Sequence, residues 1–114
     1  MKDVTLITYT VTDLTKAKRF FGELIGAEPY ADFPQYVGYK SGEMEIGLVP
    51  GGDTREPCAL PYWTVSDIAA TVKALVAAGG AVVQDITDVA MGLLVASVKD
   101  PNGATVGLRQ FPKS

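Results

Sequence analysis

The stretch Val11-Thr12-Asp13-Leu14 returns in the second half of the chain as Val65-Ser66-Asp67-Ile68. A glycine follows each copy after the same interval, Gly26 in the first case and Gly80 in the second. Self-similarity of this kind indicates that one structural unit has been used twice. We therefore analysed the chain as two related halves.

A helix is predicted between the aspartate and the glycine of each copy. Asp13 and Asp67, or the hydroxyl residue before each (Thr12 and Ser66), suit the N-cap, where a short side-chain oxygen accepts a hydrogen bond from the first free N–H groups. Gly26 and Gly80 suit the C-terminal position that needs a positive φ. The buried stripes are expected to contain apolar residues at helical spacing: Leu14, Ala17, Phe21, Leu24 and Ile25 in the first helix, joined by Phe20, and Ile68, Val72, Leu75 and Val76 in the second.

Strands rich in β-branched and aromatic residues surround both helices. The expected strands are Val4–Val11, Ala27–Tyr30, Gln35–Lys40 and Glu43–Val49 in the first half, and Tyr62–Val65, Ala81–Ile86, Leu93–Val98 and Ala104–Gln110 in the second. A tight turn is expected at Asp100-Pro101-Asn102-Gly103. The prediction is an α+β fold: a single domain, 1–114, with βαβββ modules at 1–50 and 61–114 and a linker at 51–60. Together the modules would form a curved mixed sheet around a cleft.

Composition excludes several classes of function. The 114 residues contain 10 Lys and Arg against 13 Asp and Glu, for a net charge of −3, which argues against nucleic acid or an anionic membrane as a partner. The absence of histidine excludes mechanisms that need an imidazole base or metal ligand. Cys58 stands alone, so no internal disulfide is possible, and a nucleophilic role for it is not favoured. No signal peptide is expected, and the longest apolar run, Ala74–Val83, is too short to cross a bilayer, so we expect a cytoplasmic protein.

Several motifs in this order resemble the vicinal oxygen chelate superfamily, which includes glyoxalase I, extradiol dioxygenases and the bleomycin- and fosfomycin-resistance proteins. The matching segments are Val11-Thr-Asp-Leu with Phe20-Phe21 and Leu24-Ile25-Gly26, Val65-Ser-Asp-Ile with Gly79-Gly80, and Lys99-Asp-Pro-Asn-Gly-Ala-Thr-Val-Gly-Leu-Arg-Gln. The resemblance covers nearly the whole chain. It implies the paired βαβββ fold and a homodimer, since members commonly pair through strand edges.

The resemblance also implies where a divalent metal would be held, by one residue from the first and one from the last strand of each half. Counted from the matched motifs, these positions fall at Leu6, Gly47, Pro61 and Gly107. None of these side chains can coordinate a metal, and within two residues on the same strand face only Glu45 is a strong ligand. We therefore expect no metal and no other cofactor.

Two charged residues are candidates for chemistry in the cleft. Glu45 shares a strand face with Gly47 and could act as a general base or pair with a cationic ligand, or it could be an ordinary solvated or salt-bridged residue. Arg109 shares a face with Gly107 and could bind a carboxylate or phosphate, pair with Glu45, or lie solvated at a strand end.

The remaining candidates would shape the pocket. Tyr36 and Trp63 stand out among the aromatic residues near the opening (the others are Phe33, Tyr39 and Tyr62), although aromatic residues also serve as core or dimer interface. Gly47 and Gly107 would leave room for a ligand. Thr8 could form one hydrogen bond or simply fill its strand, and Met91 could line the pocket mouth or fill a gap in the core.

These observations lead to two hypotheses and a weaker third. The first is a metal-free protein that binds a small planar or amphipathic organic molecule, as the bleomycin-resistance branch does, with ligand contacts from Leu6, Thr8, Tyr36, Gly47, Trp63, Met91, Gly107 and Arg109. The second is a lyase, isomerase or dioxygenase of the superfamily, either metal-free with Glu45 as the base or with an unrecognised metal site. The third is a regulatory module with a protein partner.

Overall fold

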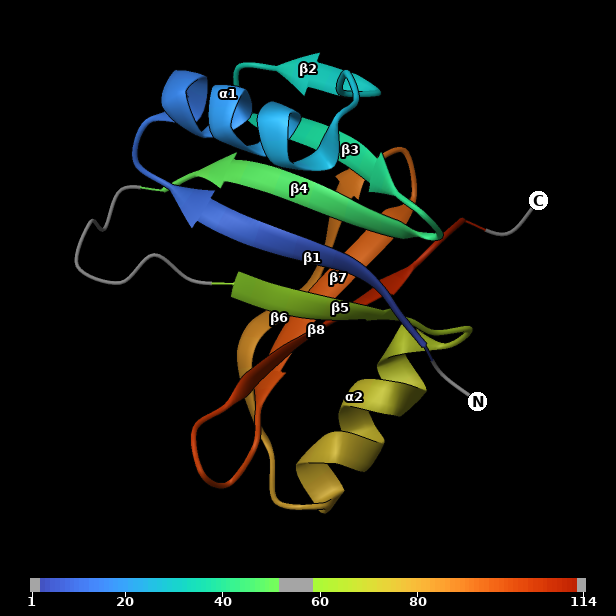
Figure 1. Ribbon diagram of the computed structural model, residues 1–114. Helices are drawn as coiled ribbons and strands as arrows, with labels where there is room; N and C mark the ends of the chain where they lie inside the picture. The colour runs from blue at the N-terminus through green and yellow to red at the C-terminus, as the bar shows by residue number, and fades with distance from the viewer. Residues whose placement is uncertain (1–2, 52–58, 113–114) are drawn as a thin grey trace. The chain divides into compact units, whose positions relative to one another are not determined.

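A computed structural model describes residues 3–51 and 59–112. These residues form eight strands and two helices (Figure 1). The elements are β1 (Val4–Val11), α1 (Leu14–Ile25), β2 (Ala31–Phe33), β3 (Tyr36–Ser41), β4 (Met44–Pro50), β5 (Ala59–Thr64), α2 (Ile68–Ala77), β6 (Ala81–Ala90), β7 (Leu93–Lys99) and β8 (Thr105–Gln110). The chain divides into two compact units, which we call the first module, Thr5–Leu60, and the second module, which contains the chain from Pro61 onward together with Val4 at the start of β1. The predicted α+β class and the repeated βαβββ order are confirmed.

In the first module, the strands lie in the order β2-β3-β4-β1. β1 runs parallel to β4, whereas β3 is antiparallel to β2 and to β4, so the sheet is mixed. One face of this sheet is covered by α1 (Figure 1). The buried core between them contains Val37, Tyr39 and Leu48, against which Tyr9, Leu14, Ala17, Phe21, Ile25 and Ile46 pack.

The capping residues of α1 match the prediction. The Asp13 carboxylate accepts a hydrogen bond of 3.0 Å from the Lys16 N–H, and Gly26 ends the helix with a φ of 75°. The expected core positions Phe20 and Leu24 are wrong, because these side chains are 65% and 70% exposed. Each of them precedes a packed residue, Phe21 or Ile25, and neighbouring helical residues point about 100° apart. The sheet covers a narrower stripe than the amphipathic pattern suggests.

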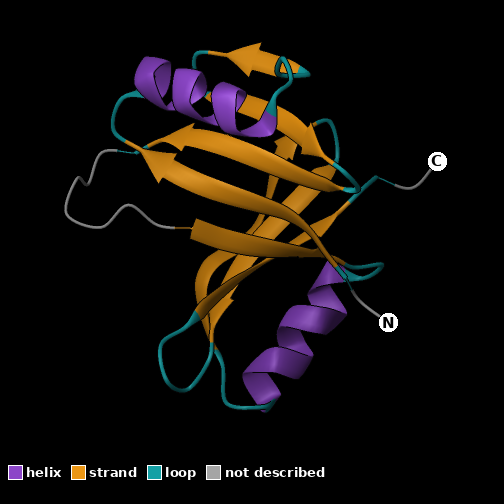
Figure 2. Cartoon of the chain, in the orientation of Figure 1, coloured by secondary structure: helices purple, strands orange, loops and turns teal. Residues whose placement is uncertain are grey.

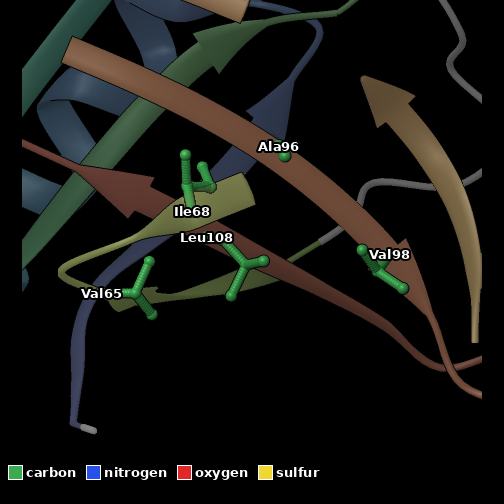
Figure 3. Close-up of a cluster of buried hydrophobic side chains, with 5 residues drawn as sticks. All are labelled: Val65, Ile68, Ala96, Val98 and Leu108. Carbon is green, nitrogen blue, oxygen red and sulfur yellow. The ribbon is translucent and has the colours of Figure 1, made fainter. Parts of the chain in front are cut away.

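The second module repeats the plan with the strand order β5-β8-β7-β6. β5 and β8 are parallel, and β7 is antiparallel to both β6 and β8. Figure 3 shows the buried cluster that joins α2 to this sheet, formed by Val65, Ile68, Ala96, Val98 and Leu108. Each module thus has one helix and one four-stranded sheet (Figure 2).

The second helix starts as predicted but ends differently. The Asp67 carboxylate accepts a hydrogen bond of 3.0 Å from the Ala70 N–H. The helix ends at Ala77, and the residue with positive φ is Gly79, at 106°, rather than Gly80. A Cβ at Gly80 would lie 2.9 Å from the Leu75 carbonyl oxygen, so close packing explains this second glycine. The predicted apolar position Val76 is largely exposed.

Several strand boundaries differ from the predictions. The strand predicted at Ala27–Tyr30 is wrong, and β2 lies just after it at Ala31–Phe33, since Pro29 has no N–H to donate and the chain pairs with β3 only from Tyr30 onward. β5 begins at Ala59, inside the predicted linker, and ends before Val65. Residues 52–58 of that linker, including Cys58, lie outside the described residues.

The predicted turn between β7 and β8 is confirmed. The Asp100 carboxylate accepts hydrogen bonds from the N–H groups of Asn102 and Ala104, and Gly103 has a φ of 96°. In the described part of the chain, neither helix has the length and apolar character needed to cross a membrane.

Candidate functional site

The face of the first module's sheet opposite α1, here called the far face, contains most of the candidate residues of that module. Side chains alternate between the faces of a strand, so Ile46 and Leu48 pack toward α1 while Glu45 and Gly47 lie on the far face. The strand register places Leu6 and Lys40 beside Glu45 and places Thr8 beside Gly47. The predicted common face of Glu45 and Gly47 is confirmed.

Glu45 lies at the centre of a small polar cluster. Its carboxylate accepts a hydrogen bond of 2.5 Å from the Tyr30 hydroxyl, and the Lys40 ammonium lies 3.9 Å away. Lys40 also lies over the ring of Tyr30, 5.1 Å from its centroid. The side chain of Glu45 is only 16% exposed. We call Tyr30, Tyr36, Lys40 and Glu45 the Glu45 cluster.

The environment of Tyr30 keeps its hydroxyl protonated. Burial raises the pKa of Tyr30 well above its usual value of 10, and its hydrogen bonds with Glu45 and Tyr36 raise it further. The phenol therefore remains a hydrogen-bond donor to Glu45 across the physiological range. The Tyr30–Glu45 hydrogen bond could not be predicted from the sequence, because it depends on how the segment after α1 returns to β3.

Two glycines of the far face are covered by tyrosine rings. A Cβ at Gly38 would come within 2.7 Å of the Tyr30 ring, and a Cβ at Gly47 within 2.6 Å of the Tyr36 hydroxyl. The expectation that Gly47 leaves room for a ligand is therefore wrong, since Tyr36 fills that space. The glycines are needed because any larger residue would displace the rings that frame Glu45.

The second module contains the same kind of pair. Tyr62 lies opposite Gly107 in the strand register, and a Cβ at Gly107 would come within 2.6 Å of its ring. The room expected at Gly107 is filled in the same way. Trp63, predicted on the face of Gly107, lies opposite Leu108 instead and packs against the core on the α2 side. Strand alternation then makes Tyr62, rather than Pro61, the residue that shares the face of Gly107.

Arg109 lies on the face of Gly107, as predicted, and is only 6% exposed. Its Nε donates a hydrogen bond of 3.2 Å to the Thr64 hydroxyl, and its guanidinium lies 4.9 Å from the centroid of the Phe111 ring. Both contacts fix the position of a guanidinium that is almost fully buried.

The other predicted contact residues lie in varied surroundings. Leu6 is buried on the far face, and Thr8 is partly exposed beside Gly47. Met91 is almost fully exposed in the turn between β6 and β7, where its φ is 48°. Among the other aromatic residues considered, Tyr39 is buried in the core under α1, and Phe33 is exposed in β2.

Comparison with known proteins now decides the family. The model of the Glyoxalase/Bleomycin resistance protein/Dioxygenase superfamily matches residues 4–108. The chain belongs to this superfamily. The predicted resemblance is thereby confirmed, and the two βαβββ modules are the superfamily's repeated unit.

Solved structures agree on the fold. A hypothetical protein from Bacillus halodurans C-125 has a TM-score of 0.81 at 16% identity, covering 99% of this chain and 96% of its own. Methylmalonyl-CoA epimerase from Mycobacterium tuberculosis has a TM-score of 0.72 at 16% identity, covering 97% and 88%. A glyoxalase/bleomycin resistance protein/dioxygenase superfamily member from Vibrio splendidus 12B01 has a TM-score of 0.69 at 15% identity, covering 96% and 98%. No curated protein matches the chain in sequence.

The residues at the superfamily's metal positions do not fit a metal. A coordinating side chain at Gly47 or Gly107 would meet the ring of Tyr36 or Tyr62 within 3 Å of its first carbon. Leu6 offers no donor atom. Over residues 3–51 and 59–112, no three His, Cys, Asp or Glu side chains come together in a group able to hold a metal ion.

Proposed function

We propose that this superfamily member binds a small planar or amphipathic organic molecule at the Glu45 cluster and needs no metal to do so. The observation that carries the proposal is the set of contacts around Glu45. A largely buried carboxylate is held by the Tyr30 hydroxyl and approached by the Lys40 ammonium, on a face where the metal position is a glycine beneath Tyr36. Aromatic surface beside a few fixed polar groups is what small organic ligands require of a site.

The chemistry of the cluster favours a ligand that donates hydrogen bonds. A carboxylate accepts, so an amine or amidine could pair with Glu45 in place of the Tyr30 hydroxyl. The rings of Tyr30 and Tyr36 offer flat apolar surface, and the net charge of −3 favours a cation over an anion.

The predicted contacts of the second module are proposed for that module by itself. There Arg109 would bind an anionic group, with Gly107 on the same strand face. Leu6, Thr8 and Met91 remain proposed contacts. Trp63 is not part of the proposed site, because its side chain packs on the α2 side of its sheet.

Ligand-observed NMR with a fragment set of planar amines, amidines and carboxylates tests the proposal. We expect aromatic amines or amidines to bind the wild-type protein after treatment with a chelator, and their binding to weaken at least tenfold in Glu45→Gln. Glu43→Gln is the matched control, since this substitution makes the same chemical change at an exposed position two residues away. Equal binding by all three proteins, or no binding of any fragment, would contradict the proposal.

A second candidate function is proton transfer by Glu45 as a general base. The largely buried position of the Glu45 side chain, which is 16% exposed, favours it, because a carboxylate shielded from water gains more by taking up a proton. The simplest reaction of this class removes a proton from a carbon next to a carbonyl group and returns one to the same carbon, with no other reactant.

Exchange in D2O separates the two functions. Fragments that bind and carry a C–H group next to a carbonyl would lose that proton signal with the wild-type protein if Glu45 is a base. Glu45→Asp would retain part of the exchange and Glu45→Gln would lose it. Binding without exchange supports the binding protein alone.

We also propose that two copies of the chain associate, as the superfamily resemblance implies. This association is independent of the ligand proposal and is measured by sedimentation.

A further inference from the structure

The outer face of α1 is the side of the helix turned away from its sheet, and it carries an unusual pair of exposed residues. Phe20 and Leu24 are among the most exposed large apolar side chains of the described residues. With Lys16, Arg19 and Glu23 they line a hollow of about 650 Å³ on the helix surface. Such apolar exposure beside charged residues is a feature of protein contact surfaces.

The charges on this face are ordered along the helix. Lys16 and Arg19 precede Phe20, and Glu23 follows it. With a rise of about 1.5 Å per residue, Lys16 lies roughly 6 Å before Phe20, and Glu23 lies 4.5 Å or so beyond it. The face therefore carries its positive charges before Phe20 and its negative charge after Phe20, next to Leu24.

A face of this pattern is complementary to itself when one copy is reversed. A two-fold axis through Phe20 would place each Glu23 near Lys16 and Arg19 of the second copy. It would bring the two Phe20 side chains together and set each Leu24 beside the aliphatic stem of Lys16 of the second copy. It would also align the two helix dipoles antiparallel. A parallel pairing would instead set Glu23 against Glu23. Only the antiparallel arrangement satisfies the charges, and it is isologous, as two-fold dimers are.

We propose that the outer face of α1 is a homodimer contact, in which two antiparallel α1 helices pair through Phe20 and Leu24 with Glu23 of each copy facing Lys16 and Arg19 of the other. This inference rests on the proposed association of two copies and names its surface.

The exposed edge strand β6 is the other candidate surface, and its chemistry opposes pairing. All ten of its residues are exposed, including Val83 and Val89. An antiparallel pair of β6 strands would gather Asp85 and Asp88 of both copies, four negative charges in one place. Three register shifts also break its ladder with β7. Charges and bulges on an edge strand are devices that prevent edge-to-edge pairing.

The contact proposed for α1 is small, so the dimer should be weak. One helix pair buries less than the roughly 1,200 Å² of a standard stable interface. We expect a dissociation constant in the micromolar range, on the order of 10 to 100 μM, measured by sedimentation equilibrium at low salt.

Charge reversal tests the contact directly. Glu23→Lys makes the face wholly positive, and Lys16→Glu with Arg19→Glu makes it wholly negative. We expect each variant alone to dimerise at least tenfold more weakly than the wild type, and a one-to-one mixture of the two to form a heterodimer. Lys73→Glu, an equivalent charge change on an exposed position of α2, is the control and should leave the dimer unchanged.

Substitution of the apolar centre gives a second measurement. Phe20→Ala should weaken the dimer at least tenfold while circular dichroism shows the helix content unchanged. A dimer that survives the charge reversals and Phe20→Ala would overturn the inference and point to another surface such as β6. A wild-type protein that is monomeric at about 200 μM, above the expected constant, would overturn both the surface and the association, and would leave the ligand proposal standing.

Discussion

The two modules share a backbone plan and differ in the chemistry placed upon it. In both, an aspartate caps the helix and a tyrosine ring lies on a glycine of the last strand. In the first, the same strand carries Glu45 two residues before the glycine, and its carboxylate accepts a hydrogen bond from a tyrosine hydroxyl. In the second, the same strand carries Arg109 two residues after the glycine, and its Nε donates to the Thr64 hydroxyl.

A glycine covered by a tyrosine ring recurs, although the tyrosine comes from β3 in the first module (Tyr36) and from β5 in the second (Tyr62). The charged residues are not at equivalent positions of the repeat either, because one precedes its glycine and the other follows it. The two copies therefore fill the space at the glycine in different ways and carry their charges at different positions. Each module therefore presents one buried charge of opposite sign.

The largest expected effect comes from filling the glycines. A Cβ at Gly107 would meet the root of the Tyr62 ring, which cannot move without shifting its strand, whereas a Cβ at Gly47 would meet the far end of Tyr36, which can rotate away. We expect Gly107→Ala to lower the free energy of unfolding by about 3 kcal/mol and Gly47→Ala by about 1 kcal/mol. Urea denaturation measures both, and equal losses would show that the two pairs are packed alike.

The next effect concerns the hydrogen bond that only the first module has. Tyr30→Phe removes the donor to Glu45 and should cost about 1 kcal/mol, at the lower end for a bond to a charged group because Tyr30 is half exposed. Chemical denaturation of the variant measures the loss. Tyr9→Phe is the control, since Tyr9 packs on the α1 side of the same sheet. A loss no greater than that of the control would mean that the bond contributes nothing to stability.

The sequence predicted the repeat because its signals are local. Asp13 and Asp67 cap helices through contacts within one turn, and Asp100 and Gly103 define their turn alone. The site was predicted less well, since it depends on packing between distant residues. Whether Gly47 leaves a space depends on Tyr36, and nothing in the local pattern fixes where that ring lies.

Register explains the other errors. The strand before α2 is short, so counting back from Asp67 could place either Tyr62 or Trp63 on the face of Gly107, and a shift of one residue exchanges the faces. Phe20 and Leu24 were predicted in the core because an amphipathic pattern does not show how wide a stripe the sheet covers. Tyr30 could not be predicted as a site residue, because it lies 15 residues before Glu45 in the sequence and the two side chains meet only in the folded protein.

The two helix caps should respond alike. Each aspartate accepts one backbone hydrogen bond of 3.0 Å, so Asp13→Ala and Asp67→Ala should each lower the free energy of unfolding by about 0.5–1 kcal/mol. Thermal denaturation of the two variants, with Asp13→Asn and Asp67→Asn as capping-competent controls, tests this equivalence. A difference of more than about 1 kcal/mol would show that one helix depends on its cap far more than the other.

The smallest effect is a pH dependence confined to the first module. The folded-state pKa of Tyr30 is raised above its usual value of 10. The stability that the protonated Tyr30 gives the folded protein is therefore complete below pH 10. It decreases as the pH rises above 10, because Tyr30 ionises in the unfolded chain before it ionises in the folded protein. Tyr30→Phe should therefore lose stability less steeply than the wild type between about pH 10 and 11. Identical slopes in urea titrations would refute the raised pKa.

The central claim is that this superfamily member lacks side-chain ligands at its expected metal positions, two of which are tyrosine-covered glycines, and uses Glu45 without a metal. Its most direct test is the metal content of the untagged protein, prepared without chelator and dialysed against a mixture of zinc, nickel, iron and manganese. We predict less than about a tenth of an equivalent of any of them, because a catalytic site needs about three protein ligands. A stoichiometric amount of one metal would contradict the claim and would place metal-dependent chemistry first.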